Sequence, residues 1–139
     1  MGEKIRDLMT TDLVTLDERM TVADAARFMR EENVGDVLVT HQGVLAGIVT
    51  DRDLVVRCLA DGGDPADTPL ESVCSRDLAT LAPEDDADAA VRLMEGMAVR
   101  RIPVVEDGQL LGIVSIGDLA QARDPSSALG LISEAPPNR

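Results

Sequence analysis

Apolar residues recur with helical spacing in two separate stretches of the chain. They are Val22, Ala25, Ala26 and Met29 in the first stretch, and Ala87, Ala90, Val91 and Met94 in the second. Positions i, i+3, i+4 and i+7 lie on one face of an α-helix, so each stretch predicts a helix with one buried face. Thr21 with Asp24 is a predicted capping pair for the first helix, and Asp86 is the predicted cap of the second.

Short apolar runs bounded by turn residues flank each predicted helix, and such runs predict β-strands. A first strand is expected before each helix, at residues 13–16 and 78–81. A hairpin is expected after each helix, with strands at 36–40 and 44–49, and at 101–105 and 109–114. The second hairpin turns at Asp107-Gly108, a strong turn signal. A further helix is expected to begin at Thr50 and at Ser115.

The two stretches are copies of one unit. Residues 5–54 align with residues 70–119 without a gap, so that Gly47-Ile48-Val49 falls on Gly112-Ile113-Val114. An internal repeat fixes the architecture before single residues are interpreted. We therefore predict an α/β (α+β) fold of two βαββα units related by a pseudo-two-fold axis, with a cleft between them that presents similar groups twice.

Length sets the domain organisation. A chain of 139 residues corresponds to one domain, and each copy is too small to be safely stable alone, so we expect the copies to share one core. The predicted boundaries are 4–60 for repeat one, 61–69 for the linker, 70–124 for repeat two and 125–139 for a C-terminal tail. The tail contains Leu129, Leu131 and Ile132, and the sequence leaves open whether it packs against a partner chain or frays.

Charge and composition exclude several classes of function. A net charge of −13 argues against nucleic-acid binding and against docking on an anionic membrane. No apolar run approaches the roughly 20 residues that span a bilayer, and no signal peptide is expected before repeat one, so a cytoplasmic location is predicted. Phe28 is the only aromatic residue, so aliphatic side chains would have to hold any flat ligand.

Cysteine and histidine content argues against catalysis and against metal binding. Cys58 and Cys74 do not form a disulfide framework and are expected to be small buried hydrophobes, with a redox role left open. His41 is the only imidazole and stands in a predicted turn. Neither a metal-ligand cluster nor a nucleophile with a histidine base is therefore expected, and the protein is predicted not to be an enzyme.

One short motif stands twice where a strand meets a helix: Thr50-x-x-Asp53 and Ser115-x-x-Asp118. A hydroxyl followed three residues later by an acid is a capping box, which requires no ligand. The same groups could instead bind one, because a helix start attracts phosphate, a hydroxyl can donate to a phosphate oxygen and a carboxylate can accept from ribose hydroxyls. The two interpretations do not exclude each other, and both stay open.

The duplicated unit resembles a pair of CBS domains, together called a Bateman module. The resemblance covers roughly residues 4–124 and rests on the repeat, on the glycine-containing strand that leads into each motif, and on Arg100-Arg101-Ile102-Pro103 in copy two. No enzymatic domain is attached in this sequence. The chain is therefore similar to stand-alone bacterial CBS-pair proteins, including those of the hypoxic-response type.

The resemblance implies adenosyl ligands such as AMP, ADP, ATP, S-adenosylmethionine or NAD(H) in the cleft between the copies. In copy two it implies that Ser115, Arg100 and Arg101 contact phosphate and that Asp118 holds ribose hydroxyls. It further implies that the adenine slot is lined by Thr80, Ile102 and Pro103. In copy one the corresponding residues are Thr50, Asp53, Thr15, Val37 and Leu38.

Copy one departs from this pattern. Gly35 and Asp36 replace the two arginines, and Leu38 replaces the proline. An acid beside phosphate weakens binding because like charges repel, although Arg52 offers partial compensation. The two sites are therefore expected to be unequal, with the one around Ser115 and Asp118 the better.

The predicted function is regulatory binding of an adenosyl ligand without catalysis and without a required cofactor. Apolar helix faces favour a homodimer, and the regulated client protein is not indicated by the sequence. The alternative is a protein–protein adaptor whose clefts have degenerated, which copy one already approaches.

Overall fold

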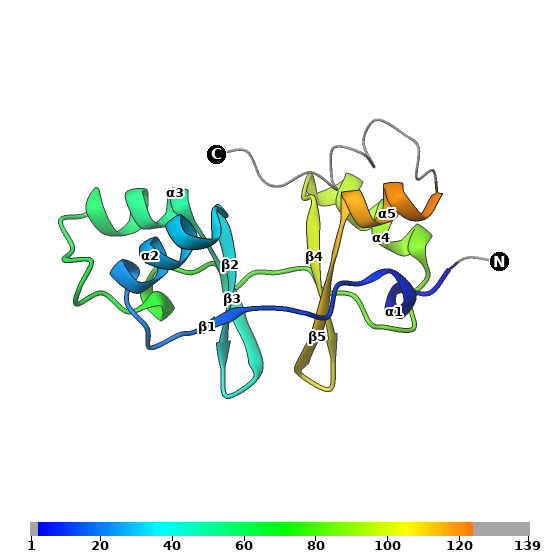
Figure 1. The fold of residues 1–139 in the computed structure, drawn as a ribbon, viewed down its shortest axis with the longest axis horizontal. Helices are drawn as coiled ribbons and strands as arrows, with labels where there is room; N and C mark the ends of the chain where they lie inside the picture. The colour runs from blue at the N-terminus through cyan, green and yellow to red at the C-terminus, as the bar shows by residue number, and fades with distance from the viewer. Residues whose placement is uncertain (1–2, 124–139) are drawn as a thin grey trace. The chain divides into compact units, whose positions relative to one another are not determined.

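The computed structural model describes residues 3–123, which form two compact units (Figure 1). Residues 14–78 make up the first-repeat unit, and residues 3–13 with 79–123 make up the second-repeat unit. The predicted C-terminal tail, residues 125–139, lies outside the described residues.

The first-repeat unit contains three strands, with one helix between the first and second strands and shorter helical segments after the third. Its elements are β1 (Thr15–Asp17), α2 (Val22–Glu32), β2 (Asp36–His41), β3 (Val44–Thr50), α3 (Asp51–Asp53), a π-helix (Leu54–Leu59) and a 3₁₀ turn (Leu70–Ser72). Strand β1 runs parallel to β2, with Leu16 opposite Val39. Strand β2 runs antiparallel to β3, with a bulge after Val39. The predicted hairpin is confirmed to within one residue at each end.

The second-repeat unit repeats the hairpin but not the first strand. Its elements are α1 (Ile5–Leu8), α4 (Ala87–Met97), β4 (Arg101–Glu106), β5 (Gln109–Ser115) and α5 (Ile116–Arg123). The predicted strand at residues 78–81 is wrong, because Leu81 makes only a single parallel bridge with Val104.

A proline explains why the first strand of copy two is lost. In copy one the ladder continues past β1 because the Glu18 N–H donates to the Thr40 carbonyl, at 2.9 Å. Pro83 occupies the position equivalent to Glu18, and proline has no N–H to donate. The prediction for copy one is also shifted, since the strand lies at 15–17 rather than 13–16.

The amphipathic helices bury the stripes that the sequence predicts. Val22, Ala25 and Met29 are buried in α2, whereas Ala26 is exposed, and Ala87, Ala90 and Met94 are buried in α4, whereas Val91 is only half-buried. The predicted caps are present: Thr21 and Asp24 form a complete capping box, and Asp86 accepts from the Ala89 N–H. The pKa of Asp24 lies below its usual value, mainly because the backbone N–H of Thr21 donates a hydrogen bond to its carboxylate. The hydrogen bond with the Thr21 side chain lowers this pKa further.

Each unit incorporates the segment that begins the other repeat. Ile5 is fully buried in the hydrophobic cluster of the second-repeat unit, and its N–H donates to the Asp85 carbonyl at 2.8 Å. Leu70 is fully buried in the cluster of the first-repeat unit, and its N–H donates to the Met20 carbonyl at 2.8 Å. Each unit therefore has its own hydrophobic cluster, and the prediction of one shared core is wrong in this respect.

Candidate functional site

In the second-repeat unit, Ser115 and Asp118 join the end of β5 to the start of α5. The Ser115 N–H donates to Asp118 Oδ2 at 2.8 Å, and the Asp118 N–H donates to Ser115 Oγ at 3.0 Å. The two residues form a capping box, as one interpretation of the sequence predicts. Since Oγ acts here as an acceptor, its own O–H is not used in the box. Capping and ligand binding by this pair are therefore chemically compatible.

The backbone brings the two arginines to the same place. Arg101 is opposite Ser115 in the β4–β5 ladder, and the Ile116 N–H donates to the Arg100 carbonyl at 2.8 Å. Both arginine side chains are exposed, whereas Ser115 and Asp118 are partly buried. Two cations, a hydroxyl and a carboxylate thus meet within one unit at the start of one helix.

The remaining residues predicted in copy two lie on the same unit. The Leu81 N–H donates to the Pro103 carbonyl at 2.9 Å, which places the exposed Thr80 beside β4. Pro103 is buried. Ile102 is fully buried in the hydrophobic cluster, so its side chain serves the core. The role of these residues in binding stays a prediction.

The first-repeat unit builds the equivalent arrangement from Thr50 and Asp53. The Thr50 N–H donates to Asp53 Oδ2 at 2.8 Å, and the Asp53 N–H donates to Thr50 Oγ1 at 3.1 Å. Asp36 is opposite Thr50 in the β2–β3 ladder, at the position that Arg101 occupies in the other unit. Thr15 is opposite Leu38 in the β1–β2 pair, and both Val37 and Leu38 are buried.

In the first-repeat unit, the carboxylate of Asp51 accepts a hydrogen bond from a backbone N–H at the start of α3. The exposed Arg52 donates its backbone N–H to Asp51 Oδ1 at 2.8 Å, and copy two has Ile116 at the position of Asp51. Arg57, which the sequence reasoning missed, lies with Nε 3.7 Å from Asp53 Oδ1. The four-residue spacing of Asp53 and Arg57 on a helix is the signal that would have found it. The two candidate sites therefore differ in charge.

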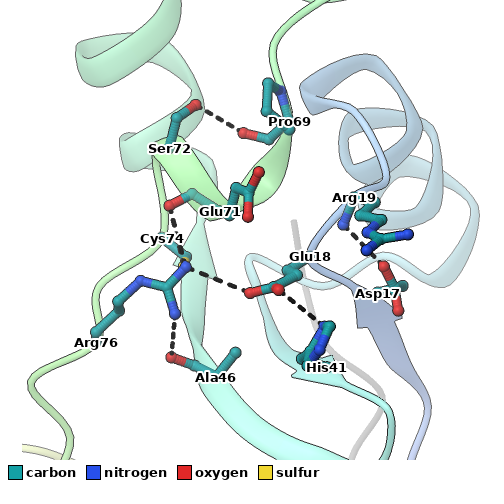
Figure 2. A network of polar contacts seen from close by, with 10 residues as sticks. All are labelled: Asp17, Glu18, Arg19, His41, Ala46, Pro69, Glu71, Ser72, Cys74 and Arg76. Atoms are coloured by element: carbon teal, nitrogen blue, oxygen red, sulfur yellow. Dashed lines mark hydrogen bonds and ion pairs between the residues drawn. The ribbon is translucent and has the colours of Figure 1, made fainter.

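A polar network around Glu18 is present in the first-repeat unit (Figure 2). Glu18 Oε2 lies 2.9 Å from His41 Nδ1, and Glu18 Oε1 lies 3.3 Å from Arg76 Nη2. Arg76 also donates to the carbonyls of Ala46 and Glu71, at 3.4 Å each. His41 is the last residue of β2. Through Glu18 and Arg76, the network connects the segment after Leu70 to the β2–β3 hairpin.

Both cysteines are free and buried, and burial raises the pKa of the Cys74 thiol. We expect iodoacetamide at mildly alkaline pH to label Cys74 slowly in the native protein, because a raised pKa keeps the thiol protonated and only the thiolate reacts. Mass spectrometry of the labelled peptide, with the protein in guanidinium as the fully reactive control, measures the rate. Equal rates in the two conditions would contradict the buried environment.

Two further features of the described residues concern membrane-spanning helices and metal-ligand groups. Within residues 3–123, every helix is too short or too polar to cross a lipid bilayer. These residues also contain no group of three or more His, Cys, Asp and Glu side chains arranged to hold a metal ion.

Comparison with known proteins agrees with the duplicated architecture. The model of the CBS domain matches residues 5–59 and again residues 70–124. The CBS domain-containing protein YhcV of Bacillus subtilis is 40% identical over 116 residues, which cover 84% of this chain and 82% of YhcV.

Two solved structures are similar over most of the chain. The crystal structure of Hypoxic Response Protein I with two coordinated zinc ions has a TM-score of 0.79 at 30% identity, covering 86% of this chain and 98% of that one. The hexameric CBS-CP12 protein from bloom-forming cyanobacteria has a TM-score of 0.68 at 29% identity, covering 92% of this chain and 78% of that one.

Proposed function

Because the chain belongs to the CBS domain family, whose domains are regulatory modules in many proteins, we propose that it is a non-catalytic sensor of an adenosyl ligand. AMP, ATP and S-adenosylmethionine are the candidate ligands, and no cofactor is required. Binding that favours one arrangement of the protein over another is sufficient for such a switch.

The arrangement around Ser115 supports this proposal. Arg101 stands opposite Ser115 in the ladder, and Asp118 follows one turn into α5. The arginines and the helix start favour phosphate, the Ser115 hydroxyl can donate to it, and the Asp118 carboxylate can accept from ribose hydroxyls. The groups that an adenosyl phosphate needs therefore stand together on the second-repeat unit.

The first-repeat unit is proposed as the weaker site. Asp36 takes the place of Arg101, and the Asp51 carboxylate accepts a backbone N–H at the helix start. Two extra acids next to a phosphate lower its affinity through like-charge repulsion. A phosphate-free or cationic adenosyl compound would suffer least from these acids.

We also propose that the protein is a cytoplasmic homodimer or a higher oligomer. The hexameric assembly of the similar CBS-CP12 protein supports self-association. Apolar side chains exposed on the described residues also support it, because such surfaces seek partners. On the helices and adjoining loops they are Val55, Val56, Leu59, Met97, Val99 and Ile116.

Thermal stability tests the ligand proposal. A ligand present at about 100 times its Kd is expected to add roughly 2.7 kcal/mol to the free energy of unfolding. Asp118→Asn is expected to abolish this gain. Differential scanning calorimetry with AMP, ATP and S-adenosylmethionine in turn measures it.

Asp53→Asn is the matched control, because it removes the same capping carboxylate from the other unit. Both variants should lose about 1 kcal/mol of intrinsic stability as caps. Asp53→Asn should retain most of the ligand effect. If Asp118→Asn loses only the cap contribution and still responds fully to ligand, its proposed role is wrong. If none of the three compounds stabilises the unmodified protein at millimolar concentration, the sensor proposal fails and the protein–protein adaptor becomes the favoured alternative.

A further inference from the structure

The helix of the first-repeat unit changes type directly after Asp53. Leu54–Leu59 form a π-helix, whereas the equivalent part of copy two lies in α5, which is α-helical as far as Arg123. π-Helical segments are rare and are frequently found at functional sites. The residues that follow Asp53 therefore have a local structure that belongs to copy one alone, and they include Arg57.

Two main-chain carbonyls hold the Arg57 side chain. Its Nη1 donates to the Val73 carbonyl at 3.3 Å and to the Cys74 carbonyl at 3.5 Å. Val73 and Cys74 are buried in the hydrophobic cluster of the same unit. The next residue, Ser75, exchanges hydrogen bonds of 2.8 and 2.9 Å with Ile48 of β3. The carbonyls that hold the guanidinium thus belong to a segment that is itself anchored.

From this position the guanidinium reaches the Asp53 carboxylate. Nε of Arg57 lies 3.7 Å from Asp53 Oδ1, and the side chain of Asp53 is only 17% exposed. The other oxygen, Oδ2, accepts the Thr50 N–H at 2.8 Å. Oδ1 is therefore the oxygen on which a ribose hydroxyl would depend most. A hydroxyl that donates to Oδ1 must compete with Arg57 for the same atom.

Copy two has the same cap without this competitor. Asp118 Oδ2 accepts the Ser115 N–H at 2.8 Å, as Asp53 Oδ2 does from Thr50. The residue equivalent to Arg57 is Ala122, and an alanine has neither a charge nor a side-chain donor. The two capping carboxylates therefore differ in their surroundings, because only that of copy one is followed four residues later by an arginine.

We infer that Arg57 masks the first-repeat site by competing for Asp53 Oδ1 from its anchor on the Val73 and Cys74 carbonyls. The inference rests on the proposed function, because it takes Asp53 as the acceptor of ribose hydroxyls. It names how the site is regulated, since a ligand binds there only when Arg57 gives up Oδ1. The ion pair of a half-exposed arginine corresponds to a factor of up to about five in an equilibrium constant, so the masking is reversible.

Calorimetric titration with adenosine tests the masking. Adenosine has ribose hydroxyls but no phosphate, so Asp36 and Asp51 do not repel it. The full-length chain carries Asp118→Asn, which removes the proposed ribose acceptor of the second-repeat unit. Adding Arg57→Ala, which installs the residue of copy two, is expected to raise the affinity for adenosine about fivefold. An unchanged, lowered or undetectable affinity would overturn the inference.

Two further variants in the same background separate masking from a structural role. Arg57→Met keeps the apolar stem and removes only the guanidinium, so it should raise the affinity as much as Arg57→Ala does. Arg30→Ala removes an equal charge from a side chain that is 74% exposed and pairs with Glu31, so it should leave the affinity unchanged. A lower unfolding temperature without a gain in affinity at position 57, or an equal gain in Arg30→Ala, would contradict the masking.

Failure of this inference and failure of the sensor proposal give different results. Suppose a ligand stabilises the unmodified chain but Arg57→Ala gives no gain for adenosine. The sensor proposal then stands and the masking is wrong. Suppose instead that AMP, ATP and S-adenosylmethionine all leave the unmodified chain unchanged while Arg57→Ala gives the expected gain. The masking of the first-repeat site is then supported, and the site at Ser115 is refuted.

Discussion

Replacing Gly47 by alanine is expected to destabilise the first-repeat unit by about 3 kcal/mol. An added Cβ would lie 2.5 Å from the Ser75 carbonyl oxygen and 3.0 Å from Cys74 Sγ. The neighbouring backbone cannot easily move away, because Ile48 and Ser75 exchange two hydrogen bonds of 2.8 and 2.9 Å. Both the overlap and the loss of this bridge contribute to the expected effect.

In the second-repeat unit, Gly112 likewise allows a distant backbone segment to approach closely. A Cβ there would lie 2.7 Å from the Thr10 carbonyl oxygen, and Thr10 and Ile113 exchange hydrogen bonds of 2.8 and 3.0 Å. The glycine that opens each repeated Gly-Ile-Val string thus admits the backbone of a distant segment. Gly112→Ala is expected to cost a similar amount in its own unit.

Gly96→Ala is the matched control for both. Gly96 lies in α4, and an added Cβ meets no atom within 4 Å. Alanine is the better helix former, so this variant should be neutral or gain up to about 1 kcal/mol. Urea unfolding followed by far-ultraviolet circular dichroism suits a chain without Trp or Tyr. If Gly47→Ala unfolds at the same urea concentration as Gly96→Ala, the close approach is wrong.

Local structure could be predicted because it depends on neighbours in sequence. The hairpins and the capping residues follow from alternation and turn residues, and they lie where the sequence places them. The helix stripes follow from periodicity and are buried except for Ala26, which is exposed, and Val91, which is half-buried. The strand expected at 78–81 fails because the partner of a β-ladder must have an N–H to donate, and Pro83 has none. That failure was visible in the sequence, but only once the ladder of copy one was known.

The candidate site could be predicted only in part. The capping geometry of Ser115 with Asp118 follows from their spacing. The hairpin turn alone would set Arg101 opposite Val114, and a bulge between Val104 and Val105 shifts the register so that Arg101 lies opposite Ser115. The Asp51 contact with the Arg52 N–H depends on a side-chain rotamer, which no sequence pattern specifies. The effect of Asp51 on the helix start therefore needed the structure.

The exchange of segments between repeats could not be predicted. Ile5 and Leu70 occupy equivalent positions, and each is followed along the chain by an amphipathic helix and a hairpin of the same kind. An apolar residue fits either core equally well as far as its chemistry is concerned. Only chain geometry decides that Ile5 enters the cluster of the second-repeat unit and Leu70 that of the first-repeat unit.

Leu70→Ala is consequently expected to destabilise the unit built from the other repeat. The side chain is fully buried, so its truncation should cost about 2–5 kcal/mol, including the cavity left behind. The loss should appear first in β2 and β3, which share the hydrophobic cluster with Leu70, although Leu70 belongs by sequence to repeat two. Ile5→Ala should have the opposite distribution, with faster opening of β4 and β5.

Native-state hydrogen exchange resolves the two units because it reports opening of each segment separately. Val14→Ala is the control, since Val14 is 60% exposed and its truncation should change neither unit. If Leu70→Ala accelerates exchange mainly in β4 and β5, the segments pack against their own repeats. In that case the buried environments of Ile5 and Leu70 described above are assigned to the wrong units, and Gly47 and Gly112 no longer face the segments that make them necessary.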